Sequence, residues 1–135
     1  MLKYLTVALL IISLIAVGCQ SQAPETSGES LSYGEITPDE VMSWMEDGKE
    51  FQLVDVREDH EYDEAHIPGA ILLPLGQLEA KYKQLDPEDV IVLVCRSGRR
   101  SGEAAEFLVE KGYTQVYNMV GGMLDWFGPL NQARR

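Results

Sequence analysis

The feature that most constrains the fold is an unbroken apolar run from Val90 to Val94, which Cys95 follows directly. A strand with one face in water alternates apolar and polar residues, and this run does not alternate. It therefore predicts a strand that is covered on both faces, as in the parallel sheet of an α/β protein. The length of 135 residues fits a single domain.

Segments of helical and extended character alternate around this run, which favours parallel pairing. Further strands are expected over residues 51–56, 70–73 and 115–120. Helices are expected over residues 38–48, 77–85, 99–111 and 121–126. The first helix begins with a capping box, in which Thr37 is followed by Pro38 and Glu40. The sequence therefore predicts a small, mostly parallel central β-sheet with helices on both faces.

The amino-terminal residues do not have the character of this domain. An apolar stretch of about fourteen residues follows one lysine, and as a helix it is too short for a bilayer core of about 30 Å. Its end, Ala16-Val17-Gly18-Cys19, resembles the lipobox of bacterial lipoproteins. That resemblance implies that residues 1–18 are a signal peptide and that Cys19 is lipidated. An uncleaved anchor, or an ordinary signal peptide with a chance cysteine, is the alternative.

The next segment, residues 19–32, is rich in Ser, Gln, Glu, Pro and Gly and contains few apolar residues. It cannot offset its ordering entropy by burial, so we expect a flexible tether between the lipidated cysteine and a domain over residues 33–135. This arrangement implies an extracytoplasmic protein on a bacterial membrane, held through the lipid anchor only. The formal net charge of -11 disfavours nucleic acid as a partner, and we expect a monomer.

Candidate chemistry gathers at Cys95, where the central strand ends and residues 96–101 lead into a helix. Ligands of open α/β sheets bind beyond the carboxyl ends of the strands, and helix amino termini bind anions. Gly98 allows the loop backbone to curl so that its N–H groups converge. Three of the eleven cations of this acidic chain fall in the loop: Arg96, Arg99 and Arg100. This pattern predicts an anion pocket with an ionised thiol at its floor. The alternative is a buried filler cysteine beside a solvated edge.

The loop Cys95-Arg96-Ser97-Gly98-Arg99-Arg100-Ser101 resembles the active-site loop of the rhodanese family. An upstream segment over residues 53–70, which contains His66-Ile67-Pro68-Gly69-Ala70, resembles a second signature of that family. A third signature is similar to residues 116–126, which include Gly121-Gly122 and Trp126. The resemblance extends from Glu35 to Trp126 and covers nearly the whole expected domain.

The resemblance implies a rhodanese-like fold and a thiosulfate sulfurtransferase. The thiolate of Cys95 would attack the outer sulfur of thiosulfate, release sulfite and keep a persulfide, which a thiol or cyanide acceptor then removes. Residues 96–101 would bind the donor, with Arg96 and Arg100 at its sulfonate end and backbone N–H groups around the sulfur. Arg99 joins them or faces solvent, where it meets an acidic partner. No metal or organic cofactor is implied.

Two other readings stay open. Cysteine phosphatases place an arginine six residues after the cysteine, whereas Ser101 stands there in this chain and Arg100 comes one residue early. One residue turns a helical side chain by about 100°, which disfavours a phosphatase or an arsenate reductase. A module that carries sulfur, or that docks a partner without useful turnover, is the second alternative.

Residues near the loop are expected to support it. Asp55 and Arg57 flank the end of a neighbouring strand and are expected to pair with each other or with the backbone. His66 precedes a Pro-Gly turn and is expected to lock that turn. The acidic run over residues 58–64 is expected to be an exposed face.

Overall fold

The computed structural model describes residues 32–132. The predicted signal peptide, the lipidation of Cys19 and the tether up to residue 31 lie outside the described residues and stay predictions. Among the described residues, no helix combines the length and the apolar character that a membrane crossing requires.

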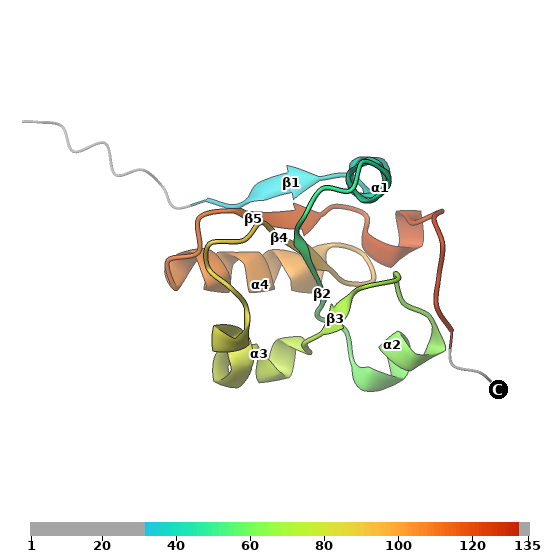
Figure 1. Cartoon of the computed structure of the whole chain (residues 1–135). Coiled ribbons are helices and arrows are strands. Elements are labelled where there is room, and N and C mark those ends of the chain that lie inside the picture. The colour runs from blue at the N-terminus through green and yellow to red at the C-terminus, as the bar shows by residue number, and fades with distance from the viewer. Residues whose placement is uncertain (1–31, 133–135) are drawn as a thin grey trace, which may run out of the picture.

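A five-stranded sheet forms the centre of the molecule, with the strand order β1-β5-β4-β2-β3 (Figure 1). Every strand pair is parallel. The strands are β1 (Gly34–Ile36), β2 (Gln52–Asp55), β3 (Ile71–Leu72), β4 (Ile91–Val94) and β5 (Val116–Met119). The central strand β4 is the apolar run on which the fold prediction depended, and the expected parallel α/β sheet is confirmed.

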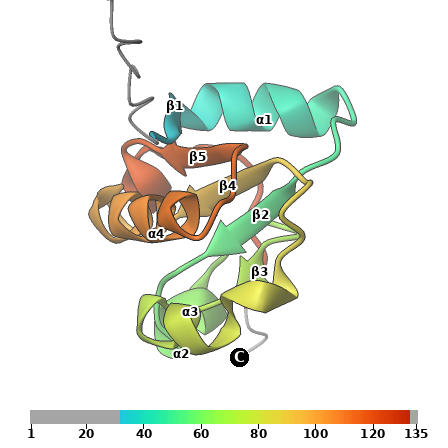
Figure 2. The same cartoon turned by 90° about the vertical axis from the view of Figure 1, so that its left-hand side faces the viewer.

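Helices cover both faces of the sheet. They are α1 (Pro38–Glu46), α2 (Asp59–Glu64), α3 (Leu75–Lys81) and α4 (Arg99–Glu110), with 3₁₀ turns η1 (Tyr82–Gln84) and η2 (Gly122–Asp125). Side chains of α3 and α4 pack in one core and those of α1 in the other, and Figure 1 shows α1 near β1, well apart from α3 and α4. Figure 2 shows α4 running along β4 and β5.

The two hydrophobic cores explain why β4 does not alternate. Ile91 and Leu93 join the core beneath α3 and α4, whereas Val92 and Val94 join the core beneath α1. All four side chains are fully buried. Both faces of the strand therefore need apolar residues.

Several element boundaries differ from the sequence prediction. β1 was not expected, and the helix expected over residues 77–85 begins at Leu75 and passes into η1. The acidic run forms α2, in which most residues are exposed as expected but Glu61 and Tyr62 are half-buried. The backbone N–H of Glu58 donates to the carboxylate of Glu61 at 3.0 Å and closes the first turn of this helix. Local capping, rather than an apolar stripe, accounts for α2.

The capping box of α1 has the expected contacts. The Thr37 N–H donates to the Glu40 carboxylate at 2.8 Å, and the Glu40 N–H donates to the Thr37 hydroxyl at 3.3 Å. Gly48 follows the helix with a φ of +68°, which is the left-handed conformation that ends many helices.

Candidate active site

Cys95 is placed by the end of β4 and by the start of α4. The strand ends at Val94, and α4 begins at Arg99. Between them Gly98 adopts a φ of +97°, and a Cβ atom there would lie 3.3 Å from the backbone nitrogen of Gly121. The loop therefore needs glycine at this position for both its backbone conformation and its close contact with the following strand's end.

The Cys95 thiol lies inside a ring of neutral hydrogen-bond donors. The Gly98 N–H donates to Sγ at 3.1 Å, and the Ser101 hydroxyl lies 3.3 Å from Sγ. The residue as a whole is only 1% exposed. The sulfur therefore sits under the loop, deeper than the open pocket floor that the sequence led us to expect.

The Ser101 hydroxyl serves two acceptors. It lies 2.6 Å from Oδ1 of Asn118 as well as 3.3 Å from the sulfur. Asn118 is held in turn by its amide nitrogen, which donates to the Gly98 carbonyl at 3.0 Å. A hydroxyl has one proton, so it bonds Asn118 while the thiol is protonated and can turn to the sulfur when the thiol ionises.

Burial raises the pKa of the Cys95 thiol, but hydrogen bonds from the Ser101 hydroxyl and from backbone N–H groups lower it more. The N–H groups belong to Ser97, Gly98 and Ser101, and the pKa ends below its ordinary value. Backbone N–H groups at the start of α4 thus stabilise the thiolate, as predicted from the sequence. The arginines, which were expected to share this task, are not among the leading causes.

The three loop arginines have different surroundings. The Arg99 side chain is 73% exposed and pairs with Glu103 one helical turn later. Of the two positions predicted for Arg99, it therefore takes the one that faces solvent. Arg100 reaches back to α2 and binds both carboxylate oxygens of Glu61 at 2.7 and 2.8 Å. Arg96 is exposed and has no acidic partner among residues 32–132.

The Arg100–Glu61 pair was not expected from the sequence. A hydrogen bond from Arg100 is the main cause that lowers the pKa of Glu61 to about 2, against its burial. The pair also raises the pKa of Arg100, and the nearby Cys95 contributes to that rise. Arg100 therefore stays charged and close to the sulfur, but its two-pronged hydrogen bond is already taken by an acid of this chain.

Asp55 and Arg57 form a buried ion pair at the end of β2. The Arg57 Nε and Nη2 atoms donate to the Asp55 carboxylate at 3.0 and 2.7 Å, and the Arg57 N–H donates to it at 3.0 Å. Nη2 also donates to the Ala65 carbonyl at 2.7 Å. Both residues thus pair with each other and with the backbone, as expected, and they tie β2 to the end of α2.

The turn η2 holds the other side of the loop. The Met123 and Leu124 N–H groups donate to the carbonyls of Cys95 and Arg96 at 2.9 and 3.0 Å. Gly122 permits this approach, because a Cβ atom there would lie 2.4 Å from the Cys95 carbonyl oxygen. The Gly-Gly sequence is therefore explained by contact with the loop.

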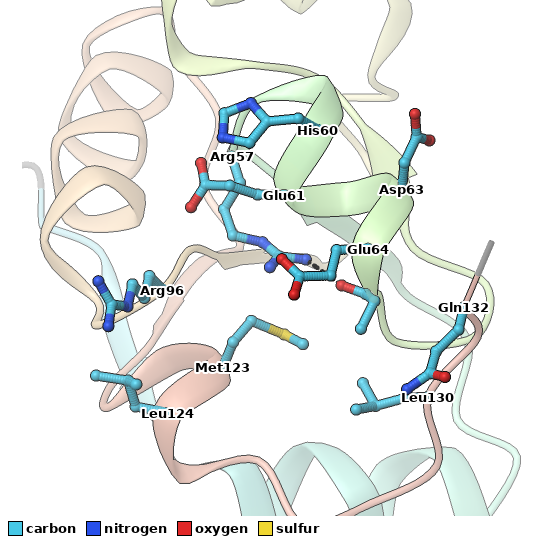
Figure 3. A pocket seen from close by; sticks show the side chains of 11 residues that line it. Arg57, His60, Glu61, Asp63, Glu64, Arg96, Met123, Leu124, Leu130 and Gln132 are labelled. Atoms are coloured by element: carbon cyan, nitrogen blue, oxygen red, sulfur yellow. Dashed lines mark hydrogen bonds between the residues drawn. The ribbon is translucent and has the colours of Figure 1, made fainter. Parts of the chain in front are cut away.

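A pocket of about 900 Å³ opens beside the loop (Figure 3). Figure 3 shows Glu61 and Glu64 on α2 across from Met123 and Leu124 on η2, with Arg96 at one end and Leu130 at the other. The pocket is lined by Arg57, His60, Glu61, Asp63, Glu64, Ala65, Arg96, Met123, Leu124, Leu130 and Gln132. Cys95 does not line it, so the pocket adjoins the sulfur site and is not identical with it.

The two histidines are placed differently. His66 stacks on Tyr62 at 3.7 Å between ring centroids, and its Nδ1 lies 2.8 Å from the Tyr62 carbonyl oxygen. Its backbone pairs with Asn131, so it locks the turn and the carboxyl-terminal segment. His60 lines the pocket. Within residues 32–132 no three His, Cys, Asp or Glu side chains are grouped closely enough for a metal ion.

The model of the rhodanese-like domain family matches residues 37–128. A rhodanese-like domain protein from Staphylococcus aureus superimposes with a TM-score of 0.68 at 31% identity, covering 73% of this chain and 97% of that one.

Among curated relatives, YrkF of Bacillus subtilis is 38% identical over 76% of this chain. The chain spans only 56% of the length of YrkF. The thiosulfate sulfurtransferase GlpE of Coxiella burnetii is 32% identical over 58% of this chain and 73% of its own length.

Proposed function

Since the chain belongs to the rhodanese-like domain family, we propose that it is a sulfurtransferase that carries a sulfane sulfur on Cys95 as a persulfide. The observation that carries the proposal is the set of donors around the thiol. The Gly98 N–H and the Ser101 hydroxyl contact Sγ, and with the other N–H groups of the loop they lower the pKa of the thiol. A thiolate is the nucleophile that such chemistry requires.

The proposed donor is thiosulfate. The Cys95 thiolate attacks the outer sulfur, the sulfur–sulfur bond of thiosulfate breaks, and sulfite leaves with the electron pair of that bond. An acceptor thiolate or cyanide then attacks the outer sulfur of the persulfide, and Cys95 leaves as the thiolate. The two steps predict ping-pong kinetics. GlpE is named for this reaction, and its similarity supports the proposal.

Arg96 is the proposed contact for the sulfonate end of the donor. Its side chain is exposed and free of acidic partners among the described residues. Arg100 adds positive charge near the sulfur while Glu61 holds it in place. The bond changes of the transfer need neither a metal nor an organic cofactor.

The proposed location is the extracytoplasmic side of a bacterial membrane. The lipobox-like sequence before Cys19 supports a lipid anchor, and the polar tether would hold a monomeric domain just above the surface. Cys95 is then the remaining thiol of the mature chain. Outside the cytosol, thiols tend to be oxidised. We propose that the persulfide is its resting form there, which intact-mass measurement on protein from its native compartment tests.

Steady-state kinetics of the full chain test the activity. We expect thiosulfate-dependent thiocyanate formation from cyanide, release of one sulfite per turnover, and loss of both in Cys95→Ser. Turnover that survives Cys95→Ser contradicts the proposal. Phosphate release from an aryl phosphate in place of sulfur transfer would indicate the phosphatase alternative.

A sulfur carrier without rapid turnover is the second candidate. The engagement of Arg100 by Glu61 favours it, because it leaves one cation fewer free to bind a small anionic donor. YrkF carries a provisional name as a sulfur carrier protein. A stable persulfide on Cys95 with negligible thiosulfate:cyanide turnover would distinguish the carrier from the enzyme.

A further inference from the structure

We propose that the pocket beside the Cys95 loop docks a cysteine-bearing polypeptide segment in which apolar and basic side chains flank the cysteine. This segment is the sulfur acceptor. The inference rests on the function proposed above, because it names the class of acceptor that the persulfide serves.

The pocket is connected to the sulfur site by short contacts. Arg96 follows Cys95 directly and lines the pocket. Met123 and Leu124 line it as well, and their N–H groups hold the carbonyls of Cys95 and Arg96. A chain that lies in the pocket is therefore held against the backbone that carries the nucleophile.

The pocket is larger than the sulfur donor needs. Its volume of about 900 Å³ lies near the upper end of the roughly 300–1,000 Å³ that is usual for sites of drug-sized ligands. Thiosulfate is far smaller and is proposed to bind at Arg96, at one end of this space. The remainder has room for several side chains.

One wall of the pocket is apolar. It consists of Met123, Leu124 and Leu130, which come from one short segment of the chain. Leu124 is 59% exposed and Leu130 is 42% exposed. Large apolar side chains that gather on one exposed surface mark interaction sites more often than scattered ones do. An apolar side chain of the partner fits this wall.

The opposite wall is acidic. Glu64 points into the pocket, and Asp63 lies at its rim with the carboxylate turned outward (Figure 3); neither has an ion pair among residues 32–132, whereas Glu61 is engaged by Arg100. The cations of the lining are Arg57, which is buried against Asp55, and Arg96 at the far end. The wall therefore carries uncompensated negative charge, and a lysine or arginine of the partner complements it.

The same charge argues against a small thiol as the preferred acceptor. Glutathione is a net anion, and this chain has a formal net charge of -11. A polypeptide segment can contact the apolar and the acidic wall together, because successive side chains of an extended chain point to opposite sides.

The transfer step is a simple exchange. The thiolate of the partner's cysteine attacks the outer sulfur of the Cys95 persulfide. A new sulfur–sulfur bond forms on the partner, the bond between Sγ and the outer sulfur breaks, and Cys95 leaves as the thiolate with that electron pair. The partner's thiol proton goes to solvent, and no external oxidant or reductant is needed.

Three synthetic peptides test the inference with the full chain. The basic peptide is acetyl-Lys-Leu-Cys-Leu-Lys-amide; the acidic peptide has Glu in place of each Lys, and the polar peptide has Ser in place of each Leu. Protein loaded with thiosulfate is desalted and mixed with each peptide, and mass spectrometry follows the loss of the added sulfur. We expect the basic peptide to react about tenfold faster than the acidic one at low salt, which corresponds to about 1.4 kcal/mol. We also expect it to react faster than the polar peptide and than glutathione.

Matched variants locate the preference. The double variant Asp63→Asn/Glu64→Gln should bring the basic and acidic peptides to similar rates. The control Glu106→Gln/Glu110→Gln removes the same charge from exposed positions of α4 and should keep the preference. Leu124→Ser should reduce the advantage over the polar peptide. Each variant is loaded with thiosulfate to completion, as checked by mass spectrometry, before a peptide is added.

Equal rates for the three peptides, a preference that survives Asp63→Asn/Glu64→Gln, or a faster reaction with glutathione would overturn the inference. If the protein takes up no sulfur at all, the proposed function fails instead. Docking is then measured by calorimetry with peptides that carry Ser in place of Cys. Tighter binding of the basic peptide that is lost in the pocket variant supports the site, and equal binding of both peptides refutes it.

Discussion

Removal of the Ser101 hydroxyl should make Cys95 a weaker acid. In Ser101→Ala the contact of 3.3 Å to Sγ is lost, and it is the leading hydrogen bond that lowers the pKa of the thiol. Hydrogen bonds to charged groups contribute about 1.5–3 kcal/mol. Because this contact is long, we take the lower end, which corresponds to about a tenfold smaller thiolate fraction below the pKa.

The measurement is the rate of iodoacetamide alkylation as a function of pH, with thiosulfate turnover alongside it. We expect the alkylation midpoint of Ser101→Ala to move to higher pH. Turnover should fall about tenfold at pH values below the wild-type midpoint and recover above the midpoint of the variant, where the thiol is ionised in both proteins.

The control is Ser97→Ala, which keeps its backbone N–H and loses a side chain that makes no hydrogen bond to the sulfur. Its midpoint should equal that of the wild type. Circular dichroism checks folding, because Ser101→Ala also leaves Oδ1 of Asn118 without its partner. An unchanged midpoint in Ser101→Ala, or a loss of turnover that no pH restores, would refute the assignment of the hydroxyl to the thiolate.

Three further predictions concern the loop and its neighbours. Glu61→Gln should lower the free energy of unfolding by about 1 kcal/mol at pH 7, because it removes an ion pair with Arg100 that is only partly buried. Glu61 has a pKa of about 2 in the folded protein against 4.5 ordinarily, so urea titrations should show this difference in full above pH 4.5 and lose it as the pH falls toward 2. Gly122→Ala should lower the free energy of unfolding by about 2–4 kcal/mol, and calorimetry should show a Tm lower by at least about 8 °C. The reason is that the added Cβ would lie 2.7 Å from the backbone of Arg96, at a residue with a φ of +59°. Arg96→Ala should raise the KM for thiosulfate about tenfold or more, whereas Arg99→Ala, at an exposed pair with Glu103, should change it less than about twofold.

The parts of the fold that could be read from the sequence are those with strong local or periodic signals. The apolar run of β4 predicted its central, two-sided burial, and Thr37 with Glu40 predicted the start of α1. β1 and α2 gave no such signal. β1 has three residues at the edge of the sheet, and α2 has no buried residue that could mark a face. Their existence depends on pairing with β5 and on capping.

The candidate site was predictable along the loop but not across the fold. The loop order placed Cys95, Gly98 and Ser101 together at the start of α4. The contacts of Asn118 with Ser101 and of Glu61 with Arg100 join residues 17 and 39 positions apart. A single sequence gives no signal for such pairs, so the loop looked more cationic than the folded site is.

The way in which negative charge is stabilised at Cys95 differs from the way in which the sequence led us to expect it. The leading contacts to Sγ are neutral N–H and O–H dipoles. Dipoles at a helix terminus stabilise an anion without forming an ion pair with it. The thiolate is therefore stabilised chiefly by the backbone of its own loop and by one hydroxyl, while Arg99 and Arg100 are engaged by Glu103 and Glu61.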